Sequence, residues 1–351
     1  MVTALGSITW KRVYFTCFAC NLGCHPADTS LGIDGFLTTQ ALRLVCLAGG
    51  QRSFAHAELL LKELCGWQVR DECIRQACHT ESDRIAAWRA DQPVPPGVKS
   101  PPTEFPVDAT TVNTDTGWRD MKIGVLAWRA CGLPASPDPW DQRSVPKPTH
   151  RLAFAAIEEI DLFAPRWGVW AQRLGLRSFE TLNVFGDGAE WIWNAAAEQF
   201  PGHRGTLDFF HAAQHIAATA DTLFGTGTPA SRVWFDAGRK ARKALLGDGW
   251  YGLQEHVGRT LCEETVREAG RTAIEHRVRY LANHSQRLNY RHRLACGEPI
   301  GSGLIEGACK QVIGKRMKQT GARWTVPNAN RMAELCCLTY SGQWAEYWLA
   351  A

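Results

Sequence analysis

The pattern of apolar and polar positions divides the chain into a helical first part and a second part in which strands alternate with helices. Apolar residues recur at helical spacing in "TTQALRLVCLAG", "SFAHAELLLKELCG" and "QVRDECIRQACHTESDRIAAW", which predicts three helices between about residues 38 and 92. The expected starts and stops of the first two helices are Thr38 or Thr39, Gly49/Gly50, Ser53 and Gly66. Helices at this spacing are compatible with a helix-turn-helix DNA-binding domain over residues 37–94, although many three-helix units share the pattern.

A proline-rich segment separates the two parts. "DQPVPPGVKSPPTEFP" holds six prolines in sixteen residues and predicts a linker, which we place at 95–104. After it, "FPVDATTVN" predicts a strand, and "TLNVFGDG" and "TLDFFH" predict two more, each followed by a helical pattern. We therefore expect an α/β sheet domain over residues 105–351. A further strand is predicted to show one apolar face made of Met121, Ile123, Val125 and Ala127.

Composition is that of a soluble globular protein. The chain has 351 residues, of which 45% are hydrophobic and 21% charged, enough for two or three domains with cores of their own. No window approaches 18 consecutive apolar residues, and the start of the chain lacks the apolar stretch of a secretory signal. Its 13 cysteines are an odd number and widely scattered, so we expect reduced thiols, a cytoplasmic location and no membrane contact.

Two segments carry more positive charge than the whole chain, whose net charge is +4. Residues 301–331 hold six basic side chains against Glu306 alone, and residues 271–293 hold six arginines against Glu275 alone. Such clusters suit phosphate contacts, and the alternative is a solvated charged face. A tryptophan in the first segment could also stack on an unpaired base. The candidate DNA-binding residues are Lys310, Lys315, Arg316, Lys318, Arg323 and Trp324.

Cysteines near the start of the chain are candidate zinc ligands. "CFACNLGCH" presents Cys17, Cys20, Cys24 and His25, and a C-x-x-C turn can place two thiolates on one zinc ion, which needs four ligands. Cys24 and His25 could complete the site, although adjacent residues rarely both bind one ion. The alternatives are half of a zinc ribbon and reduced cysteines without a metal. We assign residues 1–36 to a zinc-ribbon-like segment.

Three acidic residues stand where catalytic carboxylates are expected in an α/β sheet. Asp108 lies inside a strand pattern, where a carboxylate is unfavourable unless something offsets its desolvation. Asp187 lies between two glycines at the end of another strand, and Glu306 lies at a helix start among glycines. Three carboxylates from distant segments form an oxygen site that magnesium prefers. The plainer interpretations are a turn aspartate and a helix-start glutamate, and Asp115 and Asp120 are alternatives for the first acid.

Four blocks, in order, resemble a known family. "FPVDATTVNTDTGWRDMKIGVLAWR", "LNVFGDGAEWIW", "TLDFFHAAQHIA" and "PIGSGLIEGACKQVIGKRMKQTGARW" are similar to bacterial insertion-sequence transposases of the ISKra group, which belong with the RNase H-like DDE transposases. The resemblance covers nearly the whole chain. It implies an RNase H-like catalytic domain with an all-helical insertion at about 221–296, and a catalytic triad at Asp108, Asp187 and Glu306. Family members have more sequence before the first C-x-x-C, so the resemblance also predicts a shortened start.

The resemblance implies a DNA transposase that binds its element's ends, hydrolyses a phosphodiester and transfers the 3′-hydroxyl to target DNA. The three acids would hold two Mg²⁺ or Mn²⁺ ions, with zinc at the first cysteines as a further expectation. The implied partner is DNA, bound by a homodimer or a larger assembly. Two alternatives stay open, namely an RNase H-like nuclease that cuts without joining and a shortened, inactive DNA-binding remnant.

Overall fold

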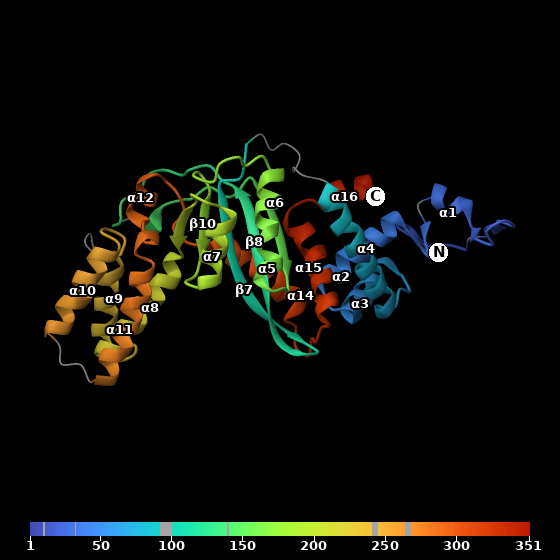
Figure 1. The fold of residues 1–351 in the computed structure, drawn as a ribbon. Coiled ribbons are helices and arrows are strands. Elements are labelled where there is room, and N and C mark those ends of the chain that lie inside the picture. The colour runs from blue at the N-terminus through green and yellow to red at the C-terminus, as the bar shows by residue number, and fades with distance from the viewer. Residues whose placement is uncertain (10, 32, 92–99, 139, 241–244, 264–267) are drawn as a thin grey trace.

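A five-stranded mixed sheet lies at the centre of an elongated molecule (Figure 1). The computed structural model describes residues 1–351 except 10, 32, 92–99, 139, 241–244 and 264–267. Residues 95–99, half of the linker predicted at 95–104, therefore lie outside the described residues. A helical lobe extends from one side of the sheet, and the N-terminal helices pack on the other side (Figure 1).

The sheet has the order β11-β10-β7-β8-β9. Its strands β7, β8 and β9 are antiparallel neighbours, whereas β10 and β11 run parallel to β7. The bounds are Glu104–Thr114 for β7, Gly117–Trp128 for β8, His150–Ala156 for β9, Asn183–Gly186 for β10 and Arg204–Leu207 for β11. The prediction of an α/β architecture is thus confirmed.

Both faces of the sheet are covered, which explains the apolar character of its strands. Met121, Ile123, Val125 and Ala127 are completely buried in one hydrophobic cluster, as their alternation predicts. Residues of the opposite parity, such as Leu126, belong to a second cluster on the other face. The helices that contribute to this second cluster include α5 (Ile160–Phe163), α6 (Pro165–Arg173), α7 (Glu190–Gln199) and α8 (Phe209–Phe224).

The three predicted N-terminal helices are present as α2 (Thr39–Gln51), α3 (Phe54–Cys65) and α4 (Asp71–Asp91). Thr38 and Ser53 cap α2 and α3 through their side chains, and Gly66 ends α3 in a left-handed conformation. The prediction that Gly49/Gly50 end the first helix is wrong, because both glycines are buried inside α2. A side chain at Gly49 would overlap Cys78 and Ile74 of α4, so this glycine permits close helix packing instead.

The N-terminal helices share a core with the sheet. Val45 of α2 and Ile74 of α4 lie in the same hydrophobic cluster as Ile123 of β8. Arg89 at the end of α4 is 1% exposed, forms an ion pair with Glu334 and donates a hydrogen bond to a carbonyl of β9. The three-helix unit is therefore fastened to the sheet by apolar packing and by a buried guanidinium.

Residues between β11 and the last part of the chain are almost wholly helical, as predicted for the insertion, within the part that the structure describes. After α8 come α9 (Pro229–Lys240), α10 (Trp250–Glu263), α11 (Glu268–Asn283), the short η2 (Ser285–Arg287) and α12 (Tyr290–Ala295). The chain then returns to the sheet through α13 (Gly303–Ala308), the π-helical η3 (Cys309–Gly314), α14 (Lys315–Met317), α15 (Val326–Tyr340) and α16 (Trp344–Ala350).

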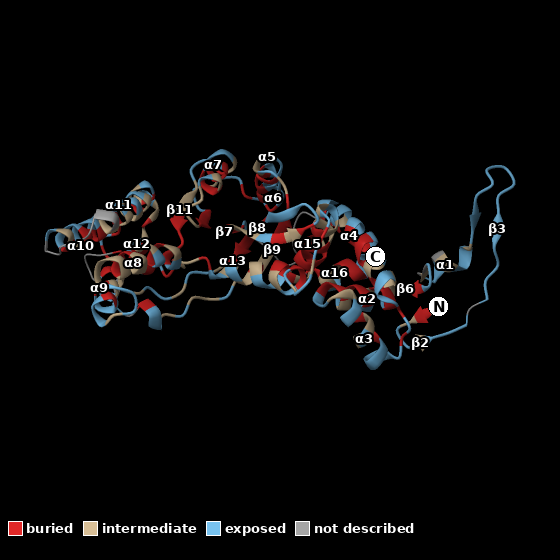
Figure 2. Cartoon of the chain, turned by 90° about the horizontal axis from the view of Figure 1, so that it is seen from below, coloured by how far each residue is buried: buried red, intermediate tan, exposed pale blue. Residues whose placement is uncertain are grey.

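The described residues before α2 form short strands and one helix, α1 (Pro26–Ser30). A hairpin of β3 (Phe15–Thr16) and β4 (Gly23–Cys24) projects away from the rest of the molecule (Figure 2). The remaining strands form a small sheet of β1 (Val2–Thr3), β2 (Gly6–Ser7), β5 (Ile33–Asp34) and β6 (Leu37–Thr38). Among the described helices, none combines the length and the apolar character needed to span a bilayer.

Candidate active site

Three aspartates lie side by side on neighbouring parallel strands, with Asp108 inside β7 and the other two directly after the ends of β10 and β11. Phe185 of β10 pairs with Pro106 of β7, so two residues further on Asp187 is level with Asp108. Gly186 pairs with Leu207 of β11, which sets Asp208 beside Asp187 in the same way. The sequence predicted two of these aspartates as site residues, and the register of the sheet brings them together. We call Asp108, Asp187 and Asp208 the aspartate row.

Asp108 points to the sheet face on which α13 and η3 pack, because Phe105 and Val107 of the opposite parity belong to the cluster on the other face. Its Oδ1 atom accepts a hydrogen bond from the Ala109 N–H at 2.7 Å. Burial raises the pKa of the Asp108 carboxyl to about 6, the Ala109 N–H opposes this, and the charge of Asp187 adds to it. This carboxylate is therefore held in a place where a positive charge would be favoured.

Asp187 is held by the turn that follows β10. Its Oδ1 atom accepts a hydrogen bond from the Ala189 N–H at 2.9 Å, and its carbonyl accepts one from the Trp193 indole at 2.9 Å. A side chain at Gly188 would overlap the ring of Tyr280 from α11. Helix α11 thus packs directly on the turn that carries Asp187.

Asp208 is a residue that our sequence analysis missed. It is 4% exposed, and its Oδ1 atom caps α8 by accepting from the His211 N–H at 2.7 Å. Its Oδ2 atom accepts hydrogen bonds from both the backbone N–H and the hydroxyl of Ser302. An aspartate between an apolar strand and a helical pattern in "TLDFFH" was a signal for the cap, but nothing local indicated the contact with Ser302.

Glu306 is on α13, which packs against β7 and β8. Ser302 occupies the expected helix-start position but does not cap the helix, because its hydroxyl bonds to Asp208. The Glu306 side chain is half-exposed and lies 3.7 Å from the Lys310 ammonium. One turn further, the Cys309 thiol lies 3.9 Å from Oδ2 of Asp108, and burial followed by the Asp108 charge raises the pKa of this thiol to about 12. Glu306, three residues earlier, is thus on the helix side that approaches Asp108.

The carboxylate oxygens of Asp108, Asp187 and Glu306 suit a hard cation, but the three side chains do not all meet in this structure. Among the described residues, no three His, Cys, Asp or Glu side chains are close enough together to share a metal ion. Asp108 and Asp187 are neighbours, whereas Glu306 is paired with Lys310. Carboxylate oxygens are the ligands that Mg²⁺ prefers, so the two aspartates fit this ion. The convergence of all three carboxylates on one site stays a prediction.

Four of the candidate DNA-binding residues are exposed, namely Lys310, Lys315, Lys318 and Arg323. The Lys318 ammonium donates to the Thr110 hydroxyl, and the Arg323 guanidinium donates to the backbone carbonyl of Asp115 at 3.0 Å. Both cations are therefore held beside β7, the strand that carries Asp108.

The other two DNA-binding candidates are corrected by the structure. Arg316 is 3% exposed and donates to the Gly49 carbonyl at 2.6 Å, with its guanidinium over the rings of Phe54 and Trp324. Trp324 is 8% exposed, and its indole donates to the Met317 carbonyl. Both side chains belong to the core between α2 and the last helices, so neither faces DNA in this structure. Their spacing in a basic segment gave no sign of this burial.

Two histidines of α8, His211 and His215, and His284 after α11 pack around one tyrosine of α11. The ring of His215 stacks on Tyr280 at 4.0 Å, and His211 and His284 also contact that ring. Burial first, and the charge of His211 second, lower the pKa of His215 to about 4. His215 is therefore neutral near pH 7 and packs on the Tyr280 ring.

The candidate zinc ligands are exposed on the projecting hairpin. Cys17, Cys20 and Cys24 all reach solvent, and they are not gathered with His25 into a group of three among the described residues. The Nδ1 atom of His25 is 3.0 Å from the Val13 carbonyl. The four residues thus do not form one closed zinc site, and the expectation of zinc stays a prediction.

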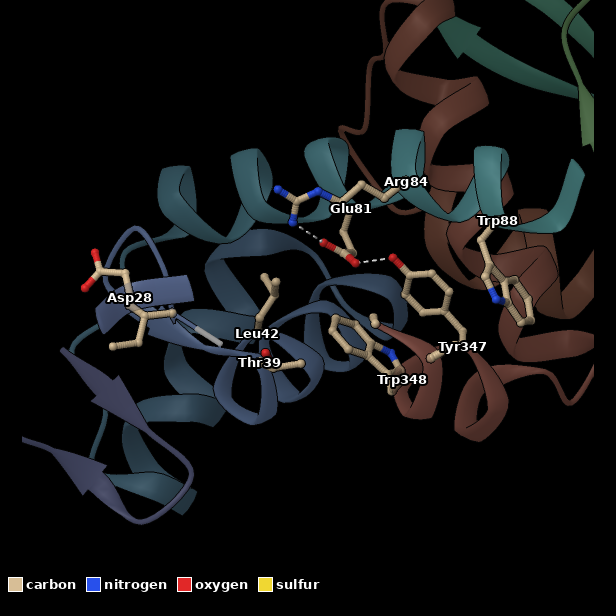
Figure 3. Close-up of a pocket in the computed structure, with 11 residues that line it drawn as sticks. Asp28, Thr39, Leu42, Glu81, Arg84, Trp88, Tyr347 and Trp348 are labelled. Atoms are coloured by element: carbon tan, nitrogen blue, oxygen red, sulfur yellow. Dashed lines mark hydrogen bonds and ion pairs between the residues drawn. The ribbon is translucent and has the colours of Figure 1, made fainter. Parts of the chain in front are cut away.

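A pocket with a volume of about 560 Å³ lies elsewhere, between α4 and α16 (Figure 3). Its central carboxylate, Glu81, accepts from the Tyr347 hydroxyl and pairs with Arg84 at 3.1 Å. Both carboxylate oxygens of Glu81 therefore already have a partner within the protein. No member of the aspartate row lines this pocket.

Comparison with protein-family models and with curated proteins gives no match for this chain. The case for a function therefore depends on the geometry of the aspartate row and its surroundings.

Proposed function

We propose that this protein is a DDE-type DNA transposase, which binds the ends of its element, hydrolyses a phosphodiester and joins the 3′-hydroxyl to target DNA. One observation carries the proposal. Asp108 and Asp187 come from segments far apart in sequence and lie level on neighbouring parallel strands, and α13, which carries Glu306, packs against β7 and β8. Clustered carboxylates at strand ends of an α/β sheet are typical of catalytic sites.

The sheet topology supports an RNase H-like catalytic domain. Three antiparallel strands are followed by two that run parallel to the first, with helices on both faces. The helices between Asp187 and Glu306 support the expected insertion, and the exposed cations on η3 and α14 support DNA as the partner. The three-helix unit of α2 to α4 would add contacts to the element ends.

Asp108, Asp187 and Glu306 would hold Mg²⁺ or Mn²⁺ through their oxygens. When bound, two such ions supply an activated water or 3′-oxygen and neutralise charge on the leaving group. The protein contributes the placement of the acids. The Ala109 and Ala189 N–H groups orient the two aspartates, and the Ser302 contact with Asp208 positions the helix of Glu306. Glu306 must leave Lys310 to join this set.

A glutamine substitution separates binding from chemistry. Glu306→Gln keeps the side-chain shape and removes the charge, so we expect parental affinity for end DNA and a loss of nicking and joining in Mg²⁺ of at least about a hundredfold. Glu198→Gln, at an exposed glutamate of α7, is the matched control and should cleave normally. Parental cleavage by Glu306→Gln would show that Glu306 is only a helix-start residue.

The products distinguish the alternatives. An oligonucleotide end substrate together with a supercoiled target should yield joined products if the protein is a transposase. Cleavage without joining under the same conditions would favour an RNase H-like nuclease, and binding without cleavage would favour an inactive remnant.

A further inference from the structure

The side chain of Cys309 contacts the first acid of the aspartate row. Its thiol donates a hydrogen bond to Oδ2 of Asp108, with 3.9 Å between sulfur and oxygen. The other oxygen, Oδ1, accepts a hydrogen bond from the Ala109 N–H at 2.7 Å. Two donors on different oxygens fix the plane of the carboxylate. These two bonds take only two of its roughly four acceptor positions, so they leave room for a cation on both oxygens.

Cys309 is held beside Asp108 by its own helix and by the core. It is the first residue of the π-helical η3, which continues directly from α13. The Lys315 N–H donates to the Lys310 carbonyl, five residues earlier, and π-helical turns of this kind are rare and frequent at functional sites. The Cys309 side chain is half-buried and packs against the hydrophobic cluster that contains Ile123, the residue opposite Asp108 on β8.

The chemistry of sulfur separates this thiol from the expected metal ligands. Mg²⁺ and Mn²⁺ bind oxygen ligands, whereas thiols suit softer metals. A thiol that donates to a metal-binding carboxylate therefore acts on the carboxylate and not on the ion. Such hydrogen-bonding partners set the orientation of the ligand, and their loss typically costs roughly ten- to a hundredfold in metal affinity or activity.

We propose that Cys309 is a positioning residue, whose thiol holds Asp108 in the orientation that binds Mg²⁺ or Mn²⁺. The inference rests on the metal site of the proposed function and adds to it a side chain that does not touch the ion. Cys309 lies three residues after Glu306 on one continuous helical segment. The same hydrogen bond therefore also ties the helix of Glu306 to the strand of Asp108. Removing the donor should weaken ion binding and leave the affinity for DNA unchanged, because the exposed cations of η3 and α14 stay in place.

Titration of the metal-free whole chain with Mn²⁺, followed by electron paramagnetic resonance, measures ion binding without DNA. The difference between the parent and Asp108→Asn defines the ion bound at this site. Cys309→Ala and Cys309→Val both remove the donor, the first with a loss of volume and the second with little change, and each should raise the Kd for Mn²⁺ about tenfold. Cys309→Ser keeps a donor and should stay within about threefold of the parent. Cys73→Ala is the matched control and should bind as the parent does, because Cys73 is also half-buried against the same cluster.

The outcomes separate this role from packing and from the proposed function. Parental Mn²⁺ affinity in Cys309→Ala and Cys309→Val would overturn the proposal. A Cys309→Ser protein as weak as Cys309→Ala, or an equal loss in Cys73→Ala, would also overturn it, because either result would assign the loss to packing. Without Asp108-dependent Mn²⁺ binding in the parent, the metal site and this role would both be lost. The expected differences in Mn²⁺ binding, found in a protein that cleaves no DNA, would support the role of Cys309 and count against the transposase.

Discussion

Asp208 accepts two hydrogen bonds from Ser302, one from its backbone N–H and one from its hydroxyl at 2.7 Å, although 94 residues separate them in sequence. The contact joins the end of β11 to the start of α13, the helix that carries Glu306. Asp208 is 4% exposed and uses its other oxygen to cap α8. The position of Glu306 relative to Asp108 therefore depends on a third aspartate at the same sheet edge.

Asp208→Asn should weaken the binding of Mg²⁺ that cleavage requires, and leave DNA binding unchanged. The amide nitrogen cannot accept the Ser302 N–H, so the start of α13 loses a buried hydrogen bond. We expect the Mg²⁺ concentration for half-maximal cleavage to rise about tenfold, equivalent to about 1.4 kcal/mol, with cleavage restored at high Mg²⁺. Ser302→Ala removes one of the two bonds and should have a smaller effect. An equal loss of rate at every Mg²⁺ concentration would instead indicate a general structural role.

Asp108→Asn should stabilise the metal-free protein at pH 8. The folded pKa of Asp108 is raised to about 6 from 3.8, so the folded state binds its proton more tightly and this group's contribution to stability falls as pH rises between those values. Replacing it should raise the free energy of unfolding at pH 8 by on the order of 1–2 kcal/mol, with little change at pH 4. Thermal melting in EDTA at both pH values measures this. A lower melting temperature at pH 8 would contradict the electrostatic explanation.

Thermal melting with added Mg²⁺ tests whether these acids bind the ion. The parent protein should melt higher when Mg²⁺ is added at pH 8, because binding to the folded state stabilises it. Asp108→Asn and Glu306→Gln should lose most of this increase, whereas Glu198→Gln should keep it.

Lys315 and Arg316 are adjacent in sequence and should respond oppositely to substitution. Lys315 is exposed, so Lys315→Ala should reduce DNA affinity and lower the salt-dependence slope by about one, with melting unchanged. Arg316 is buried between Phe54 and Trp324, so Arg316→Ala should cost about 3 kcal/mol of stability and leave the slope unchanged. Gel-shift titrations across salt and denaturant unfolding measure both. A stable Arg316→Ala protein with a shallower slope would place this arginine at the DNA.

Gly188→Ala tests the contact between the insertion and the turn of Asp187. The added methyl group would overlap the Tyr280 ring, so we expect lower stability and slower cleavage. In the Gly188→Ala/Tyr280→Ala double variant the overlap is absent. We expect its destabilisation to be about 1–3 kcal/mol less than the sum of the single effects. Additive effects in urea unfolding would show that the two residues do not interact.

Local pattern alone was enough to predict many elements of this fold. Thr38, Ser53 and Gly66 mark helix ends because capping depends on residues within one turn. The alternation from Met121 to Ala127 predicted a strand with one buried face because successive side chains point to opposite sides. Asp108 was an expected site residue because an acid inside an apolar strand is costly without a function.

Contacts between distant segments were decided only by the tertiary structure. Sheet register placed Asp187 level with Asp108, and the return of the chain at α13 gave Asp208 its partner Ser302. Arg316 resembles its exposed neighbours in sequence, yet aromatic rings from two other segments enclose it. Gly49 resembles a helix stop, yet α4 requires it inside α2. Sequence patterns report neighbours along the chain, whereas burial and the partners of a charged group depend on residues that only folding brings together.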